Sequence, residues 1–249
     1  MALVFAGGVG TRMDRGDDLP KQFIEVGGSP ILVHTLRRFQ ECPDVDLVYL
    51  VVPTSWIDHT IKLVTGYRLS KVAAVVRGGD TALESVYNGL ERIVADDLPE
   101  NAIVLVHDGV RPIINNQLIC ANIDTTRQEG NAITCIPAFE TIALRASTCD
   151  VVDSVVNRQS AVVLQAPQTF FLADVFETNL RAHQDGVMSG FVDQADMQSY
   201  YGKPLHLVEG FRGNVKITIP DDVRYFSYLI ETGAYAQVIT DQPDRARVL

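Results

Sequence analysis

The sequence predicts an α/β fold in which helices cover both faces of a mainly parallel sheet. Short apolar runs rich in β-branched residues alternate with segments of helical period, which is typical of βαβ units. The runs are apolar throughout, as in strands that are buried on both faces. The chain has 249 residues, enough for a full core, and no repeat, linker or low-complexity block divides it. We therefore expect a single domain over residues 1–249.

Eight apolar runs are the expected strands, with helices between them. Helix starts are marked by capping residues or by a first-turn proline. The strands cover residues 2–6, 47–52, 72–76, 102–106, 132–136, 151–156, 161–164 and 205–208. Helices are expected after the cap and first-turn proline Ser29-Pro30, after Thr54, from Asn115 or Asn116, and from Pro220-Asp221-Asp222; another places Leu83, Val86, Leu90, Ile93 and Val94 on one face.

The rhythm of strand and helix changes between about residues 139 and 158. Strand-like runs follow one another there without a helix between them. We expect this segment to form a β-arm that projects from the main domain. After Gly233 we expect a loosely ordered tail.

The charge balance excludes some classes of partner. With 21 Lys+Arg against 31 Asp+Glu, the net charge is −10, so a polyanionic nucleic acid or an anionic membrane would meet like charge. No apolar run approaches the roughly 18 residues of a membrane-spanning helix, and the start lacks the basic region of a signal peptide. The cysteines lack short ligand spacing, so we expect structural thiols in a reduced, cytoplasmic protein rather than disulfides or zinc. They are Cys42, Cys120, Cys135 and Cys149.

The strongest local signal follows the first expected strand. It is Ala6-Gly7-Gly8-Val9-Gly10-Thr11-Arg12-Met13, followed by Pro20-Lys21-Gln22-Phe23. The glycines let successive N–H groups form an anion-binding nest, and Arg12 and Lys21 add positive charge for phosphate oxygens. The pattern matches neither a P-loop nor G-x-G-x-x-G. An ordinary glycine turn is the alternative, and the two basic residues favour phosphate binding over it.

A second signal lies at the carboxyl end of the run 102–106, in Val106-His107-Asp108-Gly109-Val110-Arg111-Pro112. Ligands of open α/β sheets bind outside these strand ends, so Asp108 is placed to hold Mg²⁺ and Arg111 to meet phosphate. A capped turn with a salt bridge is the alternative, and it is a stronger rival for Arg111 than for Asp108. His107 is taken as structural, because no nucleophile motif accompanies it.

Two further segments carry candidate residues. Gly78-Gly79-Asp80 leads to Ser85, and the backbone and hydroxyl there can read a base edge and a ribose. Lys216 follows Gly213-Asn214 in an alternation of polar and apolar residues. A lysine on the buried side needs an anionic partner, whereas a solvated strand lysine does not. The sequence leaves both possibilities for Lys216 open.

The four segments, with the stretch Gln165-Ala166-Pro167-Gln168-Thr169-Phe170, resemble the polyol-phosphate cytidylyltransferase family. This family comprises the methylerythritol-phosphate and the ribitol-5-phosphate enzymes, and the resemblance runs from Leu3 to about Ile230. It implies a Rossmann-like nucleotidyltransferase fold with a β-arm that embraces a second subunit. It also implies the reaction of CTP with a polyol phosphate to give a CDP-polyol and pyrophosphate, with Mg²⁺ as cofactor.

The resemblance also implies roles for individual residues. The triphosphate and catalysis are assigned to Arg12, Lys21 and Lys216, and Mg²⁺ to Asp108. The substrate phosphate is assigned to Arg111 together with the arm of the neighbouring subunit. The implied nucleotide-binding residues are Ala6, Gly7, Gly8, Gly10, Gly79, Asp80, Ser85 and Asp108, and the implied substrate-binding residues are Arg111, Thr141, Arg158 and Asp193.

The polyol is indicated by smaller features. The stretch Trp56-Ile57-Asp58-His59-Thr60 is similar to the ribitol-5-phosphate enzymes, and Ala143 stands where methylerythritol enzymes tend to carry lysine. Both favour ribitol 5-phosphate, for a cell-surface polymer, although Trp56 can also be a core aromatic. The alternatives are a methylerythritol-phosphate enzyme and a non-catalytic nucleotide-binding homologue. The non-catalytic alternative is motivated by Ala82, which stands where the family usually has an arginine. Arg77 is a candidate to compensate for the loss of that arginine. In addition, Ala166 stands where the family has a threonine.

Overall fold

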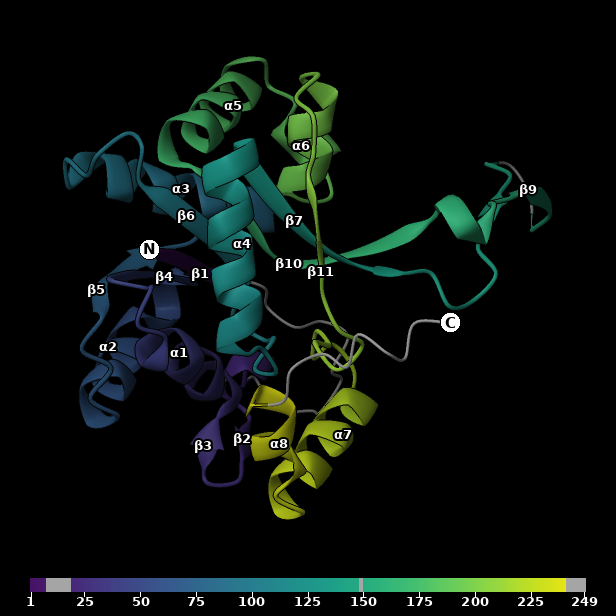
Figure 1. The fold of residues 1–249 in the computed structure, drawn as a ribbon. Helices are drawn as coiled ribbons and strands as arrows, with labels where there is room; N and C mark the ends of the chain where they lie inside the picture. The colour runs from purple at the N-terminus through teal and green to yellow at the C-terminus, as the bar shows by residue number, and fades with distance from the viewer. Residues whose placement is uncertain (8–18, 148–149, 241–249) are drawn as a thin grey trace.

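A seven-stranded sheet forms the centre of the molecule (Figure 1), in a computed structural model that describes residues 1–7, 19–147 and 150–240. The strand order is β11-β7-β10-β6-β1-β4-β5, and β10 alone among these runs antiparallel to its neighbours β6 and β7. The predicted α/β fold with a mainly parallel sheet is therefore confirmed. The strands are β1 Ala2–Phe5, β4 Val48–Val52, β5 Val72–Arg77, β6 Ile103–Asp108, β7 Asn131–Pro137, β10 Val162–Phe171 and β11 Leu207–Glu209.

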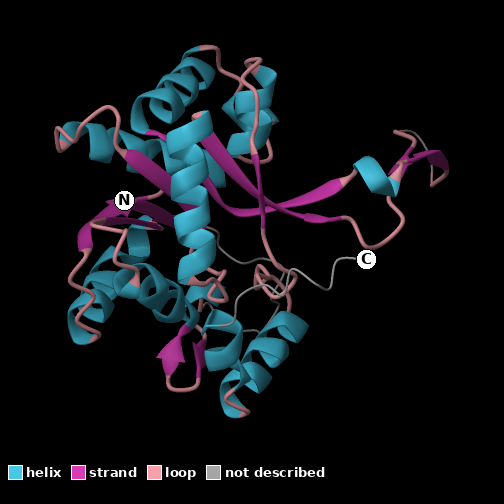
Figure 2. Ribbon diagram, in the orientation of Figure 1, coloured by secondary structure: helices cyan, strands magenta, loops and turns pink. Residues whose placement is uncertain are grey.

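Helices cover both faces of this sheet, as predicted (Figure 2). Side chains of α1, α2 and α4 pack on one face, and those of α3, α5 and α6 pack on the other. The helices are α1 Ile31–Glu41, α2 Ile57–Gly66, α3 Ala82–Ala95, α4 Asn116–Glu129, α5 Leu172–Gln184, α6 Gln194–Tyr200, α7 Pro220–Glu231 and α8 Ala234–Thr240.

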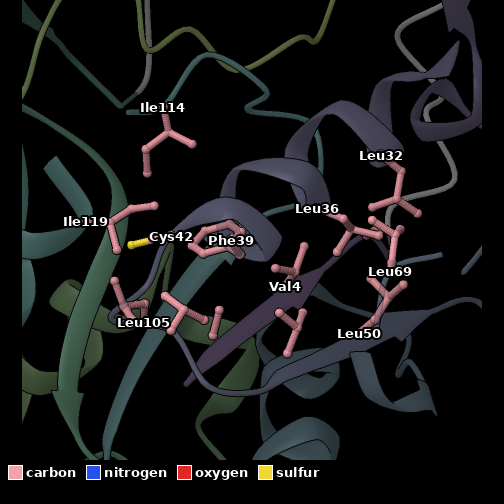
Figure 3. Close-up of a cluster of buried hydrophobic side chains, with 14 of the residues drawn as sticks. Val4, Leu32, Leu36, Phe39, Cys42, Leu50, Leu69, Leu105, Ile114 and Ile119 are labelled. Carbon is pink, nitrogen blue, oxygen red and sulfur yellow. The ribbon is translucent and has the colours of Figure 1, made fainter. Parts of the chain in front are cut away.

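Strand β1 shows how the sequence supplies both layers of core. Successive side chains of a strand point to opposite faces, so Val4 packs under α1 while Leu3 packs under α3. Figure 3 shows the first of these layers, with Val4 and Leu50 of the sheet beneath Leu36 and Phe39 of α1. Burying the apolar side chains of both layers stabilises the fold by roughly 25 cal/mol per Å² of apolar surface removed from water.

The start of α1 differs from the prediction. Ser29–Pro30 forms the short strand β3, which pairs with β2, Glu25–Val26, instead of capping the helix with Ser29. Pro30 occupies the N-cap position, and no side chain caps α1. The Ile31 N–H donates to the carbonyl of Ile24 instead. The segment before the helix thus provides a hydrogen-bond partner for one of the free N–H groups at the start of α1.

Other predicted helix starts have mixed outcomes. Thr54 does not cap α2, because Thr54–Trp56 forms a 3₁₀ turn before that helix begins. Asn115 does cap α4, and its side chain accepts from the Leu118 N–H at 2.9 Å. Pro220 opens α7 in its first turn, where proline loses no intrahelical bond.

Several elements were missing from the prediction or shorter in it. Strand β10 continues past residue 164 to Phe171, although Gln165 to Gln168 interrupts the apolar run and carries a register shift. Helices α5 and α6 occupy a stretch where no element was expected. The prediction of a loosely ordered tail directly after Gly233 is wrong for Ala234–Thr240, because α8 forms there and the Tyr235 hydroxyl donates to the carbonyl of Pro112.

Strands β8, Ala143–Arg145, and β9, Val152–Val155, pair as an antiparallel hairpin beyond the ends of β7 and β10. This hairpin extends away from the body of the molecule (Figure 1) and lies in the segment predicted as an arm. Its apolar side chains are open to solvent, with Leu144 54% exposed and Val155 63% exposed.

No helix in residues 1–7, 19–147 and 150–240 combines the length and apolar character needed to cross a membrane.

Candidate active site

A cavity of about 250 Å³ opens at the carboxyl ends of the central strands. Phe5 and Asp108, the last residues of β1 and β6, lie in its wall, as expected for a ligand site of an open α/β sheet. Helix α3, strand β10 and the start of α6 complete it. The lining residues are Phe5, Ala82, Leu83, Val86, Val106, Asp108, Arg111, Leu164, Gln165, Ala166, Gln168, Val192, Asp193, Gln194 and Lys216.

Three charged side chains meet in this cavity, two from the end of β6 and the turn after it and one from a distant loop. Lys216 Nζ lies 2.6 Å from Asp108 Oδ1, and Arg111 Nε lies 2.9 Å from Asp108 Oδ2. Arg111 also donates to the carbonyl of Asn214, which fixes the loop that carries Lys216. Lys216 therefore has the anionic partner expected for a lysine on the buried side, although its side chain is 41% exposed and residues 211–218 form no strand. The salt-bridged turn considered for Arg111 is present as well.

The two cations decide the charge of Asp108. Burial alone would raise the pKa of this carboxyl, but Arg111 and Lys216 outweigh burial and lower the pKa of Asp108 to about 2. The carboxylate is ionised at neutral pH. Within this cluster, two cations against one anion leave an excess of positive charge, which favours an anionic ligand such as phosphate; Asp193 is a second carboxylate elsewhere in the cavity lining.

His107 takes no part in this charge cluster as an acid or base. Its ring is fully buried, Nε2 lies 3.1 Å from the carbonyl oxygen of Arg111, and the ring packs edge-on against Phe39. Burial lowers the pKa of His107 to about 4, so the imidazole is neutral near pH 7. These contacts agree with the structural role expected from the sequence.

Glycine turns from two strands meet at Ser85. The Ser85 hydroxyl accepts from the Gly79 N–H at 3.1 Å and donates to the carbonyl of Thr81 at 2.8 Å. A Cβ added to Gly7 would lie 2.5 Å from Ser85 Oγ, so only glycine permits this approach of the first loop. The structure thus brings Gly7, Gly79 and Ser85 together, while the side chain of the neighbouring Asp80 is exposed.

The loop after β1 is tied to the turn that carries Lys21. Gln22 is buried, and its Nε2 donates to the carbonyl of Ala6 at 2.7 Å. This bond holds the 3₁₀ turn Lys21–Phe23 beside the glycine turn, and Trp56 stacks on Phe23 with ring centroids 4.7 Å apart. Trp56 is therefore a packing residue behind this turn. The predicted residues Gly8, Gly10 and Arg12 lie outside the described residues.

A hydrogen-bond network orients the polar wall formed by β10 and α6. Gln168 Nε2 donates to Asp193 Oδ2 at 2.8 Å, and Gln168 Oε1 accepts from the Ala195 N–H. Asp193 Oδ1 accepts from the Asp196 N–H as the N-cap of α6. Nearby, Gln165 Nε2 lies 3.3 Å from the carbonyl oxygens of Phe211 and Asn214. The cavity therefore combines a fixed carboxylate with two fixed amides.

Sequence reasoning missed the amide residues Gln22, Gln165 and Gln168. A usable signal existed, because each is an amide within or beside an apolar run, and a buried amide requires hydrogen-bond partners. The predicted Asp193 does lie in the cavity. Ala82 and Ala166 also line it, so small side chains stand where the family resemblance implied larger ones, and Arg77 is not among the lining residues.

Two predicted substrate residues lie elsewhere. Thr141 and Arg158 are exposed on the arm, and neither lines the cavity of its own chain. Arg158 Nη1 donates to the carbonyl of Phe139 at 3.2 Å, across the base of the arm. One chain therefore does not bring these two residues together with Arg111.

Known proteins resemble this chain over nearly its whole length. The family model described as IspD, 2-C-methyl-D-erythritol 4-phosphate cytidylyltransferase, matches residues 1–231. A ribitol-5-phosphate cytidylyltransferase of Vibrio parahaemolyticus is 39% identical over 238 residues, covering 96% of this chain and 98% of that protein. A 2-C-methyl-D-erythritol 4-phosphate cytidylyltransferase of Syntrophus aciditrophicus is 35% identical over 226 residues, covering 90% of this chain and 92% of that protein.

The fold is similar to a solved structure of the same kind. The crystal structure of the 2-C-methyl-D-erythritol 4-phosphate cytidylyltransferase of Francisella tularensis superposes with a TM-score of 0.76 at 26% identity, covering 91% of this chain and 97% of that chain. The resemblance inferred from the ordered motifs is thereby confirmed by sequence and by fold. The chain belongs to the IspD family of cytidylyltransferases.

Proposed function

We propose that this chain transfers CMP from CTP to D-ribitol 5-phosphate, giving CDP-ribitol and pyrophosphate. The observation that carries the proposal is the charge cluster of Asp108, Arg111 and Lys216 in the cavity at the carboxyl edge of the sheet. The choice of ribitol 5-phosphate is supported by the ribitol-5-phosphate cytidylyltransferases at 39% identity, against 35% for the methylerythritol enzyme of Syntrophus aciditrophicus. CDP-ribitol would serve as an activated donor for a cell-surface polymer.

The nucleotide is proposed to lie against the glycine turns. The backbone of Ala6 and Gly7, with the loop residues Gly8 and Gly10, would hold the triphosphate through N–H groups. The turn of Gly79, Asp80 and Ser85 would meet cytosine and ribose. Support comes from the Gly79–Ser85 hydrogen bond and the close approach of Gly7 to Ser85, which join the two turns.

The reaction needs positioning and charge stabilisation rather than a protein nucleophile. A phosphate oxygen of the polyol phosphate attacks the α-phosphorus of CTP, while pyrophosphate leaves on the opposite side. The new P–O bond replaces the bond to pyrophosphate, and the dissociated monoester needs no general base. Lys216, Lys21 and Arg12 would stabilise the negative charge that develops on the phosphates.

Asp108 is the proposed magnesium ligand, and the residues present fit that ion. Its carboxylate is ionised inside the cavity, and sites of this kind hold Mg²⁺ through one or two carboxylates and the substrate phosphates. Asp108 Oδ1 pairs with Lys216 and Oδ2 pairs with Arg111. Phosphate oxygens of the substrates can take over these two cations, which frees the carboxylate for the metal ion. When bound, Mg²⁺ would neutralise charge on the reacting phosphates.

The polyol is proposed to bind along the wall of β10 and α6. A carboxylate and amides suit hydroxyl groups, because they accept and donate hydrogen bonds at fixed positions. Asp193 is held by Gln168 and by the Asp196 N–H, so its orientation is set before substrate arrives. Ala82 and Ala166 leave room in the cavity for an extended pentitol chain.

A homodimer would complete the site. The apolar side chains of the arm are exposed in one chain, and such a surface is typical of a protein interface. We propose that the arm packs against a second copy and carries Thr141 and Arg158 to the partner's cavity, where they meet the substrate phosphate with Arg111. CTP is a nucleotide of the cytoplasm, so we place the reaction there; the free thiols Cys42, Cys120 and Cys135 agree with that location.

A second candidate acceptor is 2-C-methyl-D-erythritol 4-phosphate. The description of the matching family model and the relative at 35% identity favour it. A nucleotide-binding protein without catalysis is a third possibility, motivated by Ala82. Both remain outcomes of the same experiment.

The experiment is pyrophosphate release with CTP and Mg²⁺, measured separately with ribitol 5-phosphate and with 2-C-methyl-D-erythritol 4-phosphate, with the product identified by mass spectrometry. We expect CDP-ribitol and pyrophosphate in equal amounts, and little release when UTP replaces CTP. Binding of CTP without release of pyrophosphate in the presence of either polyol phosphate would support a nucleotide-binding protein without catalysis. Equal turnover with UTP would overturn the assignment of the base.

A further inference from the structure

Two cysteines and an aspartate form a cluster that the cavity does not include. Cys42 ends α1, Asp44 lies two residues later, and Cys120 lies in the first half of α4. Their ligand atoms, two Sγ and one carboxylate oxygen, all lie within 4.8 Å of one another. Cys120 lies 76 residues from Asp44 in the sequence, which is why cysteine spacing did not predict the cluster.

The core holds Cys42, and a hydrogen bond joins the other two side chains. Cys42 is fully buried, and Figure 3 shows it beside Phe39 of α1 and Ile119 of α4. Cys120 Sγ donates to Asp44 Oδ2 at 3.1 Å. Two helices and the loop before β4 thus aim three donor atoms at one point, before any ligand binds.

We propose that Cys42, Asp44 and Cys120 bind a thiophilic divalent cation, with Zn²⁺ as the best fit. Two thiolates and a carboxylate are donors that zinc accepts, whereas Mg²⁺ and Ca²⁺ prefer oxygen alone. Zinc bonds sulfur at about 2.3 Å and oxygen at about 2.1 Å, so neighbouring ligands of a tetrahedral site lie roughly 4 Å apart. The observed separations within 4.8 Å need only a small contraction.

The cluster has a route to solvent and room for a fourth ligand. Asp44 is exposed, and it lines a second cavity of about 520 Å³ together with Met1, Asp46 and Arg127. A water from this cavity can occupy the open coordination position. Binding releases the two thiol protons to solvent and replaces the Cys120–Asp44 hydrogen bond with bonds to the metal. The resulting net charge of −1 adjoins a cavity whose lining carries Asp46 as well as the positive groups of Met1 and Arg127.

Metal binding would join the end of α1 to α4 on one face of the sheet. A ligand that binds the folded chain and not the unfolded chain raises stability in proportion to the logarithm of its concentration over Kd. None of the three residues lines the 250 Å³ cavity, so the metal would be separate from the Mg²⁺ proposed at Asp108. The metal would hold α1 and α4 together, and the inference does not rest on the proposed function.

The test is metal binding by the full reduced chain in a Cys149→Ser background. This background is needed because Cys149 lies outside the described residues, and its thiol would confuse a sulfur signal. Co²⁺ serves as the spectroscopic probe of Zn²⁺, and Zn²⁺ uptake is measured by equilibrium dialysis. We expect one metal per chain, a thiolate-to-cobalt charge-transfer band, and a higher melting temperature with Zn²⁺.

Three variants decide between this cluster and other sites. Cys120→Ala should lower the intensity of the charge-transfer band, because one of the two thiolates is gone, and should weaken binding by at least roughly tenfold. Asp44→Asn changes an exposed side chain, leaves the fold intact and should weaken Zn²⁺ binding while preserving the band. Cys135→Ala is the matched control, because Cys135 is a buried thiol on β7 outside the cluster, and its metal binding should be unchanged.

Three results would contradict the proposed zinc site. Absence of stoichiometric uptake, uptake without a thiolate band, or equal affinity in the Cys120→Ala and parent chains would each overturn the zinc site. Pyrophosphate release by the parent chain would be unaffected by those results, so the cytidylyltransferase proposal stands or falls separately.

Discussion

Asp108 joins two cations that come from different loops, and those cations face the cavity in which the phosphates are proposed to react. Lys216 is 41% exposed, whereas the carboxylate that it contacts is only 9% exposed. The ammonium group can therefore leave Asp108 for a phosphate oxygen without crossing the core. At the scale of single residues, this exchange of anionic partners is the basis of the proposed catalysis.

Removing Lys216 should slow the reaction. We expect Lys216→Ala, and likewise Lys21→Ala, to lower kcat by at least about tenfold, which is roughly 1.4 kcal/mol of lost transition-state stabilisation. The measurement is pyrophosphate release at saturating CTP and polyol phosphate. Lys203→Ala is the control, because Lys203 also pairs with carboxylates, Asp174 and Glu177, but lies outside the cavity. Unchanged turnover in both active-site variants would remove their assignment.

His107 should make the fold sensitive to acid. Burial lowers its pKa to about 4, with Asp108, Arg111 and Lys216 as the charged groups around it. In the unfolded chain the imidazole binds a proton near pH 6.5, so the unfolding free energy should fall by about 3 kcal/mol as pH drops from 6.5 to 4.

Chemical denaturation at a series of pH values tests this dependence. In His107→Gln the slope between pH 6.5 and 4 should flatten, because the titrating group is gone, while an amide can still donate to the carbonyl of Arg111. His183→Gln, at an exposed position of α5, should keep the parent slope. An equal slope in the parent and His107→Gln chains would refute the role of His107.

Charged site residues could be predicted from the sequence, and uncharged ones could not. Asp108 and Arg111 follow a strongly apolar strand, and this position predicts a ligand site in any open α/β sheet. Gln22, Gln165 and Gln168 lie in stretches that carry the family resemblance, but they have no charge, and their roles depend on partners that only the fold supplies. The pairing of Cys42 with Cys120 depends likewise on the packing of α1 against α4.

Helix α3 connects its own capping to the nucleotide turn. Thr81 Oγ1 accepts from the Glu84 N–H, and Glu84 Oε2 accepts from the N–H groups of Asp80 and Thr81, which forms a capping box. The carbonyl of Thr81 also accepts from Ser85. At the scale of elements, the start of this helix therefore sets the shape of the proposed cytosine site.

Breaking the capping box should affect stability and nucleotide binding together. Thr81→Ala should lower the unfolding free energy by about 1 kcal/mol, and it should raise the KM for CTP more than the KM for the polyol phosphate. Denaturant melts and steady-state kinetics give the two readouts. Thr65→Ala is the control, since Thr65 is an exposed threonine of α2 whose hydroxyl donates to the carbonyl of Ile61. A KM for CTP equal to that of the parent chain would contradict the link.

Elements with strong local patterns were predictable, and those built on tertiary contacts were not. The run 102–106 matches β6 closely, because its apolar residues need burial on both faces whatever surrounds them. Helix α5 begins at Leu172 with no capping side chain, so its start carries no local signal. Strand β10 crosses a polar stretch that stays in the sheet because Gln165 and Gln168 find buried partners.

The whole molecule is acidic, with a net charge of −10, yet at one place in its cavity Arg111 and Lys216 both pair with the same carboxylate, Asp108. An acidic surface repels extended polyanions, while a local excess of positive charge attracts small phosphates. The composition thus excludes one class of ligand without excluding the other. The same contrast between surface and site makes the proposed activity sensitive to ionic strength.

The assembly of two chains should depend on the arm. Leu144→Asp combined with Val155→Asp places charges on side chains that are exposed in one chain, so folding should be preserved. We expect sedimentation velocity to show a dimer for the parent chain and a monomer for this variant, with at least about tenfold lower kcat/KM for the polyol phosphate. Tyr228→Asp on α7 is a control of matched exposure. A fully active monomer would contradict the shared site.

The central claim is cytidylyl transfer to ribitol 5-phosphate, and a comparison of kcat/KM for two acceptors tests it most directly. Pyrophosphate release is measured with CTP and Mg²⁺ against ribitol 5-phosphate and, in parallel, against 2-C-methyl-D-erythritol 4-phosphate. The account predicts that kcat/KM is higher for ribitol 5-phosphate by at least roughly tenfold, about 1.4 kcal/mol of discrimination. An equal or higher value for 2-C-methyl-D-erythritol 4-phosphate, or no release with either acceptor, would contradict it.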